Sequence, residues 1–182
     1  MKKNILLGIT ASIAAHKLPS IVEKLREDYN IYVVMTENAC QFVSPLTLEV
    51  LSQNKVKISL YSGEQTKVDH VELAQNTDLI LIAPASTNLI GKYANGIADN
   101  LLTSILMVAN PKKVILCPAM NDNMYQHPIV QENLQKLKRF SVKEIEPIDC
   151  LLASGKRGKG GLAPFEIIKS GIDDHFKKNK SL

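Results

Sequence analysis

Four short apolar runs recur along the chain, and each is followed by small or polar residues. The runs lie at residues 4–9, 31–35, 79–83 and 113–117. Apolar runs of this length, without regular polar positions between them, are typical of strands buried on both faces of a parallel sheet. We also predict a last strand at residues 141–145 and a short one at residues 56–60.

Between these runs, hydrophobic positions follow the spacing i, i+3, i+4, i+7, which places them on one face of a helix. Leu18, Ile21, Val22 and Leu25 are the clearest example, and Pro19 is expected to kink the first turns of this helix or delay its start. Further helical segments are predicted at residues 37–42, 45–51, 70–74, 89–94, 101–108, from Pro128 onward and at 164–176.

Strands that alternate with helices predict an α/β fold. We expect a single doubly wound domain over residues 1–176, Rossmann-like and flavodoxin-like, with a parallel sheet and helices on both faces. Residues 61–69 are polar and loop-like, and residues 177–182 are expected to form a frayed tail. Residues 154–161 (SGKRGKGG) are rich in glycine and charge and are expected not to pack, and residues 149–163 are expected to form a mobile substrate loop.

The stretch from Asp78 to Thr103 is a candidate binding segment. Its strand ends in Pro84-Ala85-Ser86-Thr87-Asn88, which offers small side chains, hydroxyls and an amide where a helix begins. Asn95-Gly96 is a suitable C-cap for that helix, and Asp99-Asn100 can cap the next one. In an open parallel sheet, ligands bind beyond the carboxyl ends of the strands, where N–H groups and hydroxyls converge.

The turn after the first strand contains Gly8, Thr10 and Ser12. It matches neither G-x-G-x-x-G nor G-x-x-x-x-G-K-[ST], so a dinucleotide fingerprint and a P-loop are both poorly supported. Two interpretations remain for this turn: it holds a single phosphate at the helix N-terminus, or its hydroxyls only cap that helix.

Composition places the chain among soluble globular proteins. Of its 182 residues, 45% are apolar and 22% are charged. The net charge of +4 comes from basic residues scattered among acidic ones, and tryptophan is absent, which argues against nucleic-acid binding. Neither a signal peptide nor a membrane span of about 20 apolar residues is recognisable, so we expect a cytoplasmic protein without membrane contact.

The three cysteines, Cys40, Cys117 and Cys150, show no C-x-x-C spacing. Their odd number and spacing argue against a disulfide scaffold or a zinc site and fit a reducing compartment. We therefore expect no metal, and we interpret Cys40 and Cys117 as small buried hydrophobic residues.

Three separated segments together resemble one family. They are Gly8–Ala15 (GITASIAA), PASTN at 84–88 with NGIADNLL at 95–102, and PAMNDNMY at 118–125, which matches a P-x-M-N-x-x-M-[WY] substrate motif. The family is the homo-oligomeric flavin-containing cysteine decarboxylases. It includes the phosphopantothenoylcysteine decarboxylases of coenzyme A synthesis and the lantibiotic-type peptidyl-cysteine decarboxylases. The resemblance extends over residues 4–165.

The resemblance implies a bound flavin, FMN or occasionally FAD, at the boundary between subunits of a trimer or of a dodecamer built from trimers. Positions that resemble the family's flavin contacts are Gly8, Thr10, Ser12, Thr36, Phe42, Pro84, Ser86, Asn88, Asp99, Asn100 and Met120. Positions expected to contact the substrate are Asn121, Met124, Ser154, Gly155 and Lys156. Thr87 and Leu89 depart from the family's commonest Ala and Thr, which is expected to reshape the pocket without removing Ser86 or Asn88.

His70 resembles the family's catalytic base, and Asn121 resembles the residue that holds the substrate carboxylate. The reaction needs a base to help remove the thiol or Cβ proton while a hydride moves to the flavin, and imidazole suits this task. An amide orients a carboxylate by hydrogen bonding without forming a salt bridge. Considered without the resemblance, His70 is a helix cap or surface residue, Asn121 is equally well explained as a cap, and Met120 and Met124 are core residues.

The segment Ala153–Leu162 distinguishes members of the family. Members in coenzyme A synthesis usually carry Ala-Cys-Gly-Asp there, and their cysteine helps return electrons from reduced flavin to the enethiol. Here Ser154 stands in place of the cysteine and Lys156 in place of the aspartate. Because a hydroxyl is a much weaker acid than a thiol, electrons should stay on the flavin until an outside oxidant takes them, and the enethiol should be released. This outcome favours oxidative decarboxylation of a C-terminal peptidyl cysteine.

Two alternatives stay open. Phosphopantothenoylcysteine, a small cysteine-derived substrate, remains possible if Cys150, four positions before Ser154, brings its thiol to the flavin; otherwise Cys150 is a structural residue at a strand end. A flavin-binding regulatory subunit without catalysis is compatible with the missing loop cysteine, but the retention of His70 and Asn121 argues for an enzyme. The basic residues Lys156, Arg157 and Lys159 suit a substrate phosphate or a peptide carboxylate equally well.

Overall fold

The computed structural model describes residues 2–60 and 69–178. Its central element is a five-stranded parallel sheet in the order β2-β1-β3-β4-β5. The strands are β1 (Lys3–Ile9), β2 (Tyr29–Met35), β3 (Leu79–Ala85), β4 (Val114–Pro118) and β5 (Lys143–Glu144). This strand order is that of flavodoxin-like doubly wound folds, so the predicted fold class is confirmed.

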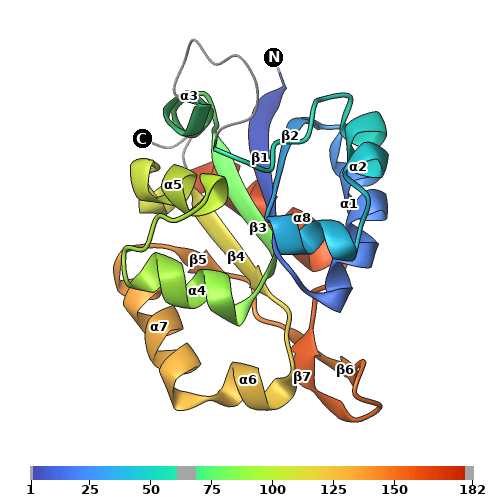
Figure 1. Cartoon of the computed structure of the whole chain (residues 1–182), viewed down its shortest axis with the longest axis vertical. Helices are drawn as coiled ribbons and strands as arrows, with labels where there is room; N and C mark the ends of the chain where they lie inside the picture. Colours follow the sequence, from blue (N-terminus) through green and yellow to red (C-terminus); the bar gives the residue numbers. More distant parts are fainter. Residues whose placement is uncertain (1, 61–68, 179–182) are drawn as a thin grey trace.

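Helices cover both faces of the sheet (Figure 1). On one face lie α1 (Leu18–Leu25), α2 (Pro45–Ser52) and α8 (Phe165–Lys178). On the other face lie α3 (Asp69–Gln75), α4 (Thr87–Ala94), α5 (Leu101–Val108) and α7 (Pro128–Arg139). No helix in the described part of the chain has the length and apolar character needed to cross a membrane.

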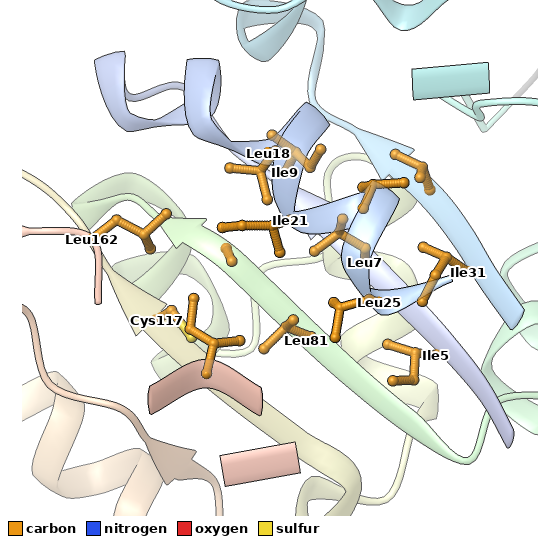
Figure 2. Packing of buried hydrophobic residues seen from close by; sticks show 14 of the residues in the cluster. Ile5, Leu7, Ile9, Leu18, Ile21, Leu25, Ile31, Leu81, Cys117 and Leu162 are labelled. Atoms are coloured by element: carbon orange, nitrogen blue, oxygen red, sulfur yellow. The ribbon is translucent and has the colours of Figure 1, made fainter. Parts of the chain in front are cut away.

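Successive side chains of a strand point to opposite faces of the sheet, so each face has its own hydrophobic core. In β1, Leu7 belongs to the cluster under α1, whereas Leu6 belongs to the cluster under α4 and α5. Figure 2 shows Leu7 and Leu81 of the sheet packed with Ile21 and Leu25 of α1. The helical stripe expected from the sequence therefore forms the inner face of α1.

Pro19 lies in the first turn of α1, where its missing N–H leaves no helical hydrogen bond unmade. The preceding residues form a short 3₁₀ helix, η1 (Ile13–Lys17), rather than an α-helix. The delayed start that Pro19 predicts is therefore confirmed. Two further 3₁₀ helices are η2 (Glu37–Gln41) and η3 (Pro111–Lys113).

An antiparallel hairpin, β6 (Ile148–Leu151) and β7 (Arg157–Gly161), projects beside the short helix α6 (Asp122–Gln126). Figure 1 shows both elements at the end of the molecule opposite the N-terminus. The expectation that residues 154–161 do not pack is wrong. A Cβ on Gly160 would overlap the carbonyl oxygen of Met120, so this glycine permits close backbone packing.

Three other local predictions also differ from the structure. Residues 56–60 form no strand; only Lys57 bridges to β2. β3 does not end before Pro84 but continues to Ala85, which pairs with Pro118. The expected tail at 177–182 begins inside α8, which includes residues 177 and 178; the rest of that tail lies outside the described residues. Most of the predicted loop at 61–69 also lies outside them.

Candidate active site

A cavity of about 1150 Å³ opens where the parallel strands end. Its wall includes Thr10 after β1, Thr36 after β2, Ser86 after β3 and Ala119 after β4. This is the edge of the sheet where ligands of doubly wound folds bind. The two loops that the sequence marks as candidate binding segments, after β1 and after β3, therefore meet in one site.

Thr10 connects these two loops through its side chain. Its hydroxyl donates to the carbonyl oxygen of Pro84 (2.7 Å) and accepts from the N–H of Ser86 (2.8 Å). With only 1% of the residue exposed, this hydroxyl has both partners within the protein. Thr10 therefore holds the loop after β3 in position relative to β1.

Ser12 and Ser86 have hydroxyls that cap helices at the cavity. Ser12 Oγ accepts from the N–H of Ala14 (3.3 Å), and Ser86 Oγ accepts from the N–H of Leu89 (3.4 Å). A hydroxyl that accepts a hydrogen bond still has its own O–H to donate. Both serines therefore cap a helix and keep an O–H that can donate to a ligand; for Ser12 the capping role is confirmed, and the binding of a phosphate stays a prediction.

Met120, in the loop after β4, contacts the start of α4 and strand β7. Its Sδ accepts a hydrogen bond from Thr87 Oγ1 (3.0 Å), and its N–H donates to the carbonyl oxygen of Gly160 (3.0 Å). Thr87 is one of the two positions that depart from the family pattern, and here its hydroxyl orients the thioether at the cavity wall.

Asn121 is the N-cap of α6 and also lines the cavity. Its Oδ1 accepts from the N–H of Asn123 (2.9 Å), while the structure gives its Nδ2 no hydrogen-bond partner among the described residues. The capping bond fixes the amide plane and leaves the N–H₂ group available to donate. The capping role and the carboxylate-binding role are therefore compatible in one side chain.

Asp99 and Asn100 contribute to the wall and organise the start of α5. Lys92 Nζ lies 2.5 Å from Asp99 Oδ2, and this hydrogen bond lowers the pKa of the Asp99 carboxyl. Asn100 forms a capping box with Thr103, as its place before α5 predicts.

The hairpin closes one side of the cavity. Cys150, Leu152, Ala153 and Ser154 all line it, together with Gly160 of β7. Ser154 is exposed, whereas Cys150 is half-buried on β6.

Most residues expected in the site are brought together. The expected residues that line the cavity are Thr10, Ser12, Thr36, Ser86, Asn88, Asp99, Asn100, Met120, Asn121, Met124 and Ser154. Those that do not line it in the single chain are Gly8, Phe42, His70, Pro84, Gly155 and Lys156.

Gly8 and His70 are two of the residues outside the cavity lining, and the structure shows what surrounds each of them. A Cβ on Gly8 would lie 2.5 Å from Ile82 Cδ1 and 2.7 Å from Leu102 Cδ1, so Gly8 is needed for packing between β1, β3 and α5. His70 is half-buried on α3, which packs against α5, and His70 is not among the residues that line the cavity.

Several lining residues have no role predicted from the sequence, among them His16, Lys17, Ser59 and Lys92. Lys92 follows Asn88 by four residues on α4, and this helical spacing is a signal that identifies it. Ser59 has no comparable signal, because its place at the cavity depends on the pairing of Lys57 with β2.

The cavity suits FMN in size and chemistry. Small-molecule pockets typically measure about 300–1,000 Å³, so a volume of about 1150 Å³ leaves room for a flavin and a substrate. Serine hydroxyls and the Asn88 amide can donate to the flavin, and His16 and Lys17 offer basic groups for a phosphate.

Comparison with known proteins gives a consistent result. The Flavoprotein family model matches residues 1–177. A probable phosphopantothenoylcysteine decarboxylase of Streptococcus mutans is 42% identical over 97% of this chain and 100% of that protein. The coenzyme A biosynthesis bifunctional protein CoaBC of Bacillus subtilis is 41% identical over 98% of this chain, which spans 44% of that longer protein.

Solved structures with this fold belong to both candidate activities. A PPC decarboxylase variant, in which a serine replaces a cysteine, is complexed with pantothenoylaminoethenethiol; it has a TM-score of 0.87 and 30% identity, covering 97% of this chain and 100% of that chain. The peptidyl-cysteine decarboxylase EpiD has a TM-score of 0.82 and 26% identity, covering 93% of this chain and 98% of that chain.

Proposed function

This chain belongs to the flavoprotein family, among the FMN-dependent cysteine decarboxylases, and we propose that its substrate is phosphopantothenoylcysteine. The observation that carries the proposal is the end-to-end similarity to the Streptococcus mutans protein, at 42% identity. Ser154 by itself favours the peptidyl substrate, but the curated relatives give more support to the coenzyme A substrate.

Asn121 is proposed to hold the substrate carboxylate. Its Nδ2 faces no partner among the described residues, and its amide plane is fixed by the cap on α6. A fixed amide donor orients the carboxylate and releases it easily when it becomes CO₂. Bound FMN would supply the hydride acceptor for oxidation of the cysteine side chain.

His70 is proposed to be the base, supplied by a neighbouring copy of the chain. It lies on α3 and does not line the cavity of its own chain. Large apolar side chains also remain exposed in the single chain, including Leu46 and Val50 of α2, each 66% exposed. Such exposure is typical of surfaces that associate, which supports a homo-oligomer, trimeric or dodecameric, with the flavin site at the subunit boundary.

A peptide ending in cysteine is the second candidate substrate. The exposed Ser154 of the hairpin favours it, because a hydroxyl is poorly suited to return a proton to an enethiol. In that case the product is the enethiol, and an outside oxidant such as dioxygen would have to remove the two electrons from bound FMN.

Mass spectrometry after incubation in air with each substrate tests the proposal. Phosphopantothenoylcysteine carried to the saturated amine should lose about 44 Da, whereas a peptide ending in Cys should lose about 46 Da as CO₂ and two hydrogens. Asn121→Asp should abolish either loss by repelling the carboxylate. Asn123→Asp, the same change at an exposed α6 position outside the cavity lining, is the matched control. Turnover of the peptide alone would reject the coenzyme A substrate.

A further inference from the structure

We propose that the Cys150 thiol supplies the proton that completes reduction of the enethiol, an inference that rests on phosphopantothenoylcysteine being the substrate. With that substrate the saturated thiol must be formed, so the site needs an acid in addition to the hydride. Ser154, at the position where relatives usually carry cysteine, is a poor acid for this purpose. The structure offers a thiol elsewhere in the same cavity.

Cys150 lies on β6, lines the cavity, and has its Sγ against Gly161 of β7. It pairs with Gly158 across the hairpin, and it lines the cavity together with Met120 and Asn121. A Cβ on Gly161 would overlap Cys150 Sγ, so the thiol occupies the space that this glycine leaves open.

Gly161 lies next to the residue that contacts the loop after β4, which carries Asn121. The preceding residue, Gly160, accepts the N–H of Met120 through its carbonyl oxygen, and Asn121 follows Met120 directly. The thiol is therefore held beside the segment that binds the substrate carboxylate, on the hydrogen-bonded part of the hairpin. Ser154 lies in the turn of the same hairpin and is exposed.

The other two thiols do not have this position. Cys117 is fully buried in the core beneath α1, where burial raises the pKa of its thiol. Cys40 Sγ donates to the carbonyl oxygen of Thr36 (3.7 Å) and does not line the cavity. The sequence has three cysteines, so Cys150 is the one thiol of this chain at the cavity.

The proposed step balances in atoms and electrons. Bound FMN, reduced by the earlier oxidation, would supply the enethiol, R–NH–CH=CH–SH, with one hydride, that is two electrons and one hydrogen. One C–H bond forms in this way, and a second forms with the proton of Cys150 Sγ–H. The product would be R–NH–CH₂–CH₂–SH, with both electrons supplied by the bound cofactor, and the Cys150 thiolate takes a proton from water.

A structural neighbour gives independent support for the need of a thiol. A PPC decarboxylase variant with one cysteine replaced by serine is the form complexed with pantothenoylaminoethenethiol, an unsaturated thiol. In the present chain the loop already carries Ser154, and the thiol function is assigned to Cys150 on the adjoining strand.

The test compares Cys150→Ser with Cys40→Ser, the same substitution at a half-buried cysteine outside the cavity lining. Each holoenzyme is incubated with phosphopantothenoylcysteine in air. Wild type and Cys40→Ser should give the product that is lighter by about 44 Da. Cys150→Ser should give mainly the product lighter by about 46 Da, with the saturated product formed about 100-fold more slowly.

A failure of the proposed Cys150 role gives a different result from a failure of the proposed function. Saturated product formed by Cys150→Ser at the wild-type rate would overturn the role of Cys150 and leave the proposed function intact. Release of enethiol by the wild type would also overturn it. Absence of any turnover of phosphopantothenoylcysteine by the wild type would overturn the proposed function and this inference with it.

A second measurement needs neither a variant nor turnover. Iodoacetamide adds about 57 Da to each accessible thiol, and peptide mapping separates Cys150 from Cys40. Saturating phosphopantothenate, a sulfur-free analogue of the substrate, should slow alkylation of Cys150 about tenfold in wild-type protein and leave Cys40 unchanged. Equal rates with and without the analogue would place the thiol outside the substrate site and reject the proposal.

Discussion

The N–H of Met120 donates a 3.0 Å hydrogen bond to the carbonyl oxygen of Gly160. This bond joins the loop after β4 to the hairpin β6–β7. In the chain, these two segments are separated by α6, α7 and β5. Asn121 follows Met120, and Cys150 lies against the residue after Gly160. The relative position of the proposed carboxylate-binding amide and the proposed proton donor therefore depends on this contact.

Gly160→Ala should separate the two segments. The added Cβ would overlap the Met120 carbonyl oxygen, a backbone atom that cannot rotate away. Overpacking of this kind costs about 1–3 kcal/mol, so we expect a lower melting temperature and at least about a tenfold loss of decarboxylation. Gly91→Ala in α4 is the control, because its Cβ would have no neighbour nearer than 3.9 Å. A fully active Gly160→Ala variant would refute the importance of the contact.

The hairpin also illustrates what sequence patterns can and cannot indicate. Apolar runs are enough to predict β1 and β3, and apolar periodicity is enough to predict α1, because these signals are local in the sequence. The glycines at 158 and 160, by contrast, suggest from composition alone a segment that does not pack. Their actual function is close approach to Met120 and Asp122, and the partner of such a contact cannot be identified from local composition.

In the candidate site, too, some features follow from local sequence, whereas others depend on distant segments. The sequence predicts Thr10, Ser86 and Asn121 there, and all three line one cavity because the ends of parallel strands meet at one edge. It also predicts a flavin contact for Gly8, which stays a prediction; the structure shows that a Cβ at Gly8 would meet Ile82 and Leu102. Whether a strand glycine faces a ligand or a neighbouring helix depends on the pairing of several distant segments, which a single sequence does not display.

Gly8→Ala should reduce stability through packing. The new Cβ would lie 2.5 Å from Ile82 Cδ1 and 2.7 Å from Leu102 Cδ1, both in the buried cluster under α4 and α5. We expect a loss of about 1–3 kcal/mol in the free energy of unfolding, measured by urea denaturation. A variant with wild-type stability and weakened FMN binding would show instead that Gly8 acts at the cofactor.

Asp78→Asn should weaken the start of the sheet in a pH-dependent way. The Asp78 carboxylate accepts from the Asn4 N–H (2.8 Å) and from Lys3 Nζ (3.0 Å), which joins β3 to β1. Burial by itself raises the pKa of this carboxyl, but the two hydrogen bonds and the lysine charge outweigh it, so the pKa is lowered.

Because folding lowers the pKa of the Asp78 carboxyl, the ionised carboxylate stabilises the folded state. The stabilisation is present above the unfolded-state value, about 3.9, and is lost as the pH falls through the lower folded-state value. Asp78→Asn should therefore lower the melting temperature at pH 7, and the difference from wild type should shrink in acid. Asp174→Asn, at an exposed position of α8, is the control. A difference that does not change with pH would contradict this explanation.

Subunit mixing tests the proposed origin of the base. His70→Asn should retain FMN but release no CO₂, and Asn121→Asp should be inactive because the carboxylate is repelled. If His70 and Asn121 of one site come from different copies, oligomers assembled from both variants contain some sites with both residues intact. Random assembly from equal amounts should restore about a quarter of the wild-type activity.

The control is a mixture of Asn121→Asp with the double variant His70→Asn/Asn121→Asp, which contains no intact Asn121 and should remain inactive. Both mixtures should be assembled from denatured chains, so that subunits exchange fully, and FMN content should be measured in each. Because Asn121 lines the cavity and His70 of the same chain does not, activity should return in the first mixture alone. Two inactive mixtures with full FMN content would show that one chain supplies both residues, and α3 would then have to move toward the cavity when substrate binds.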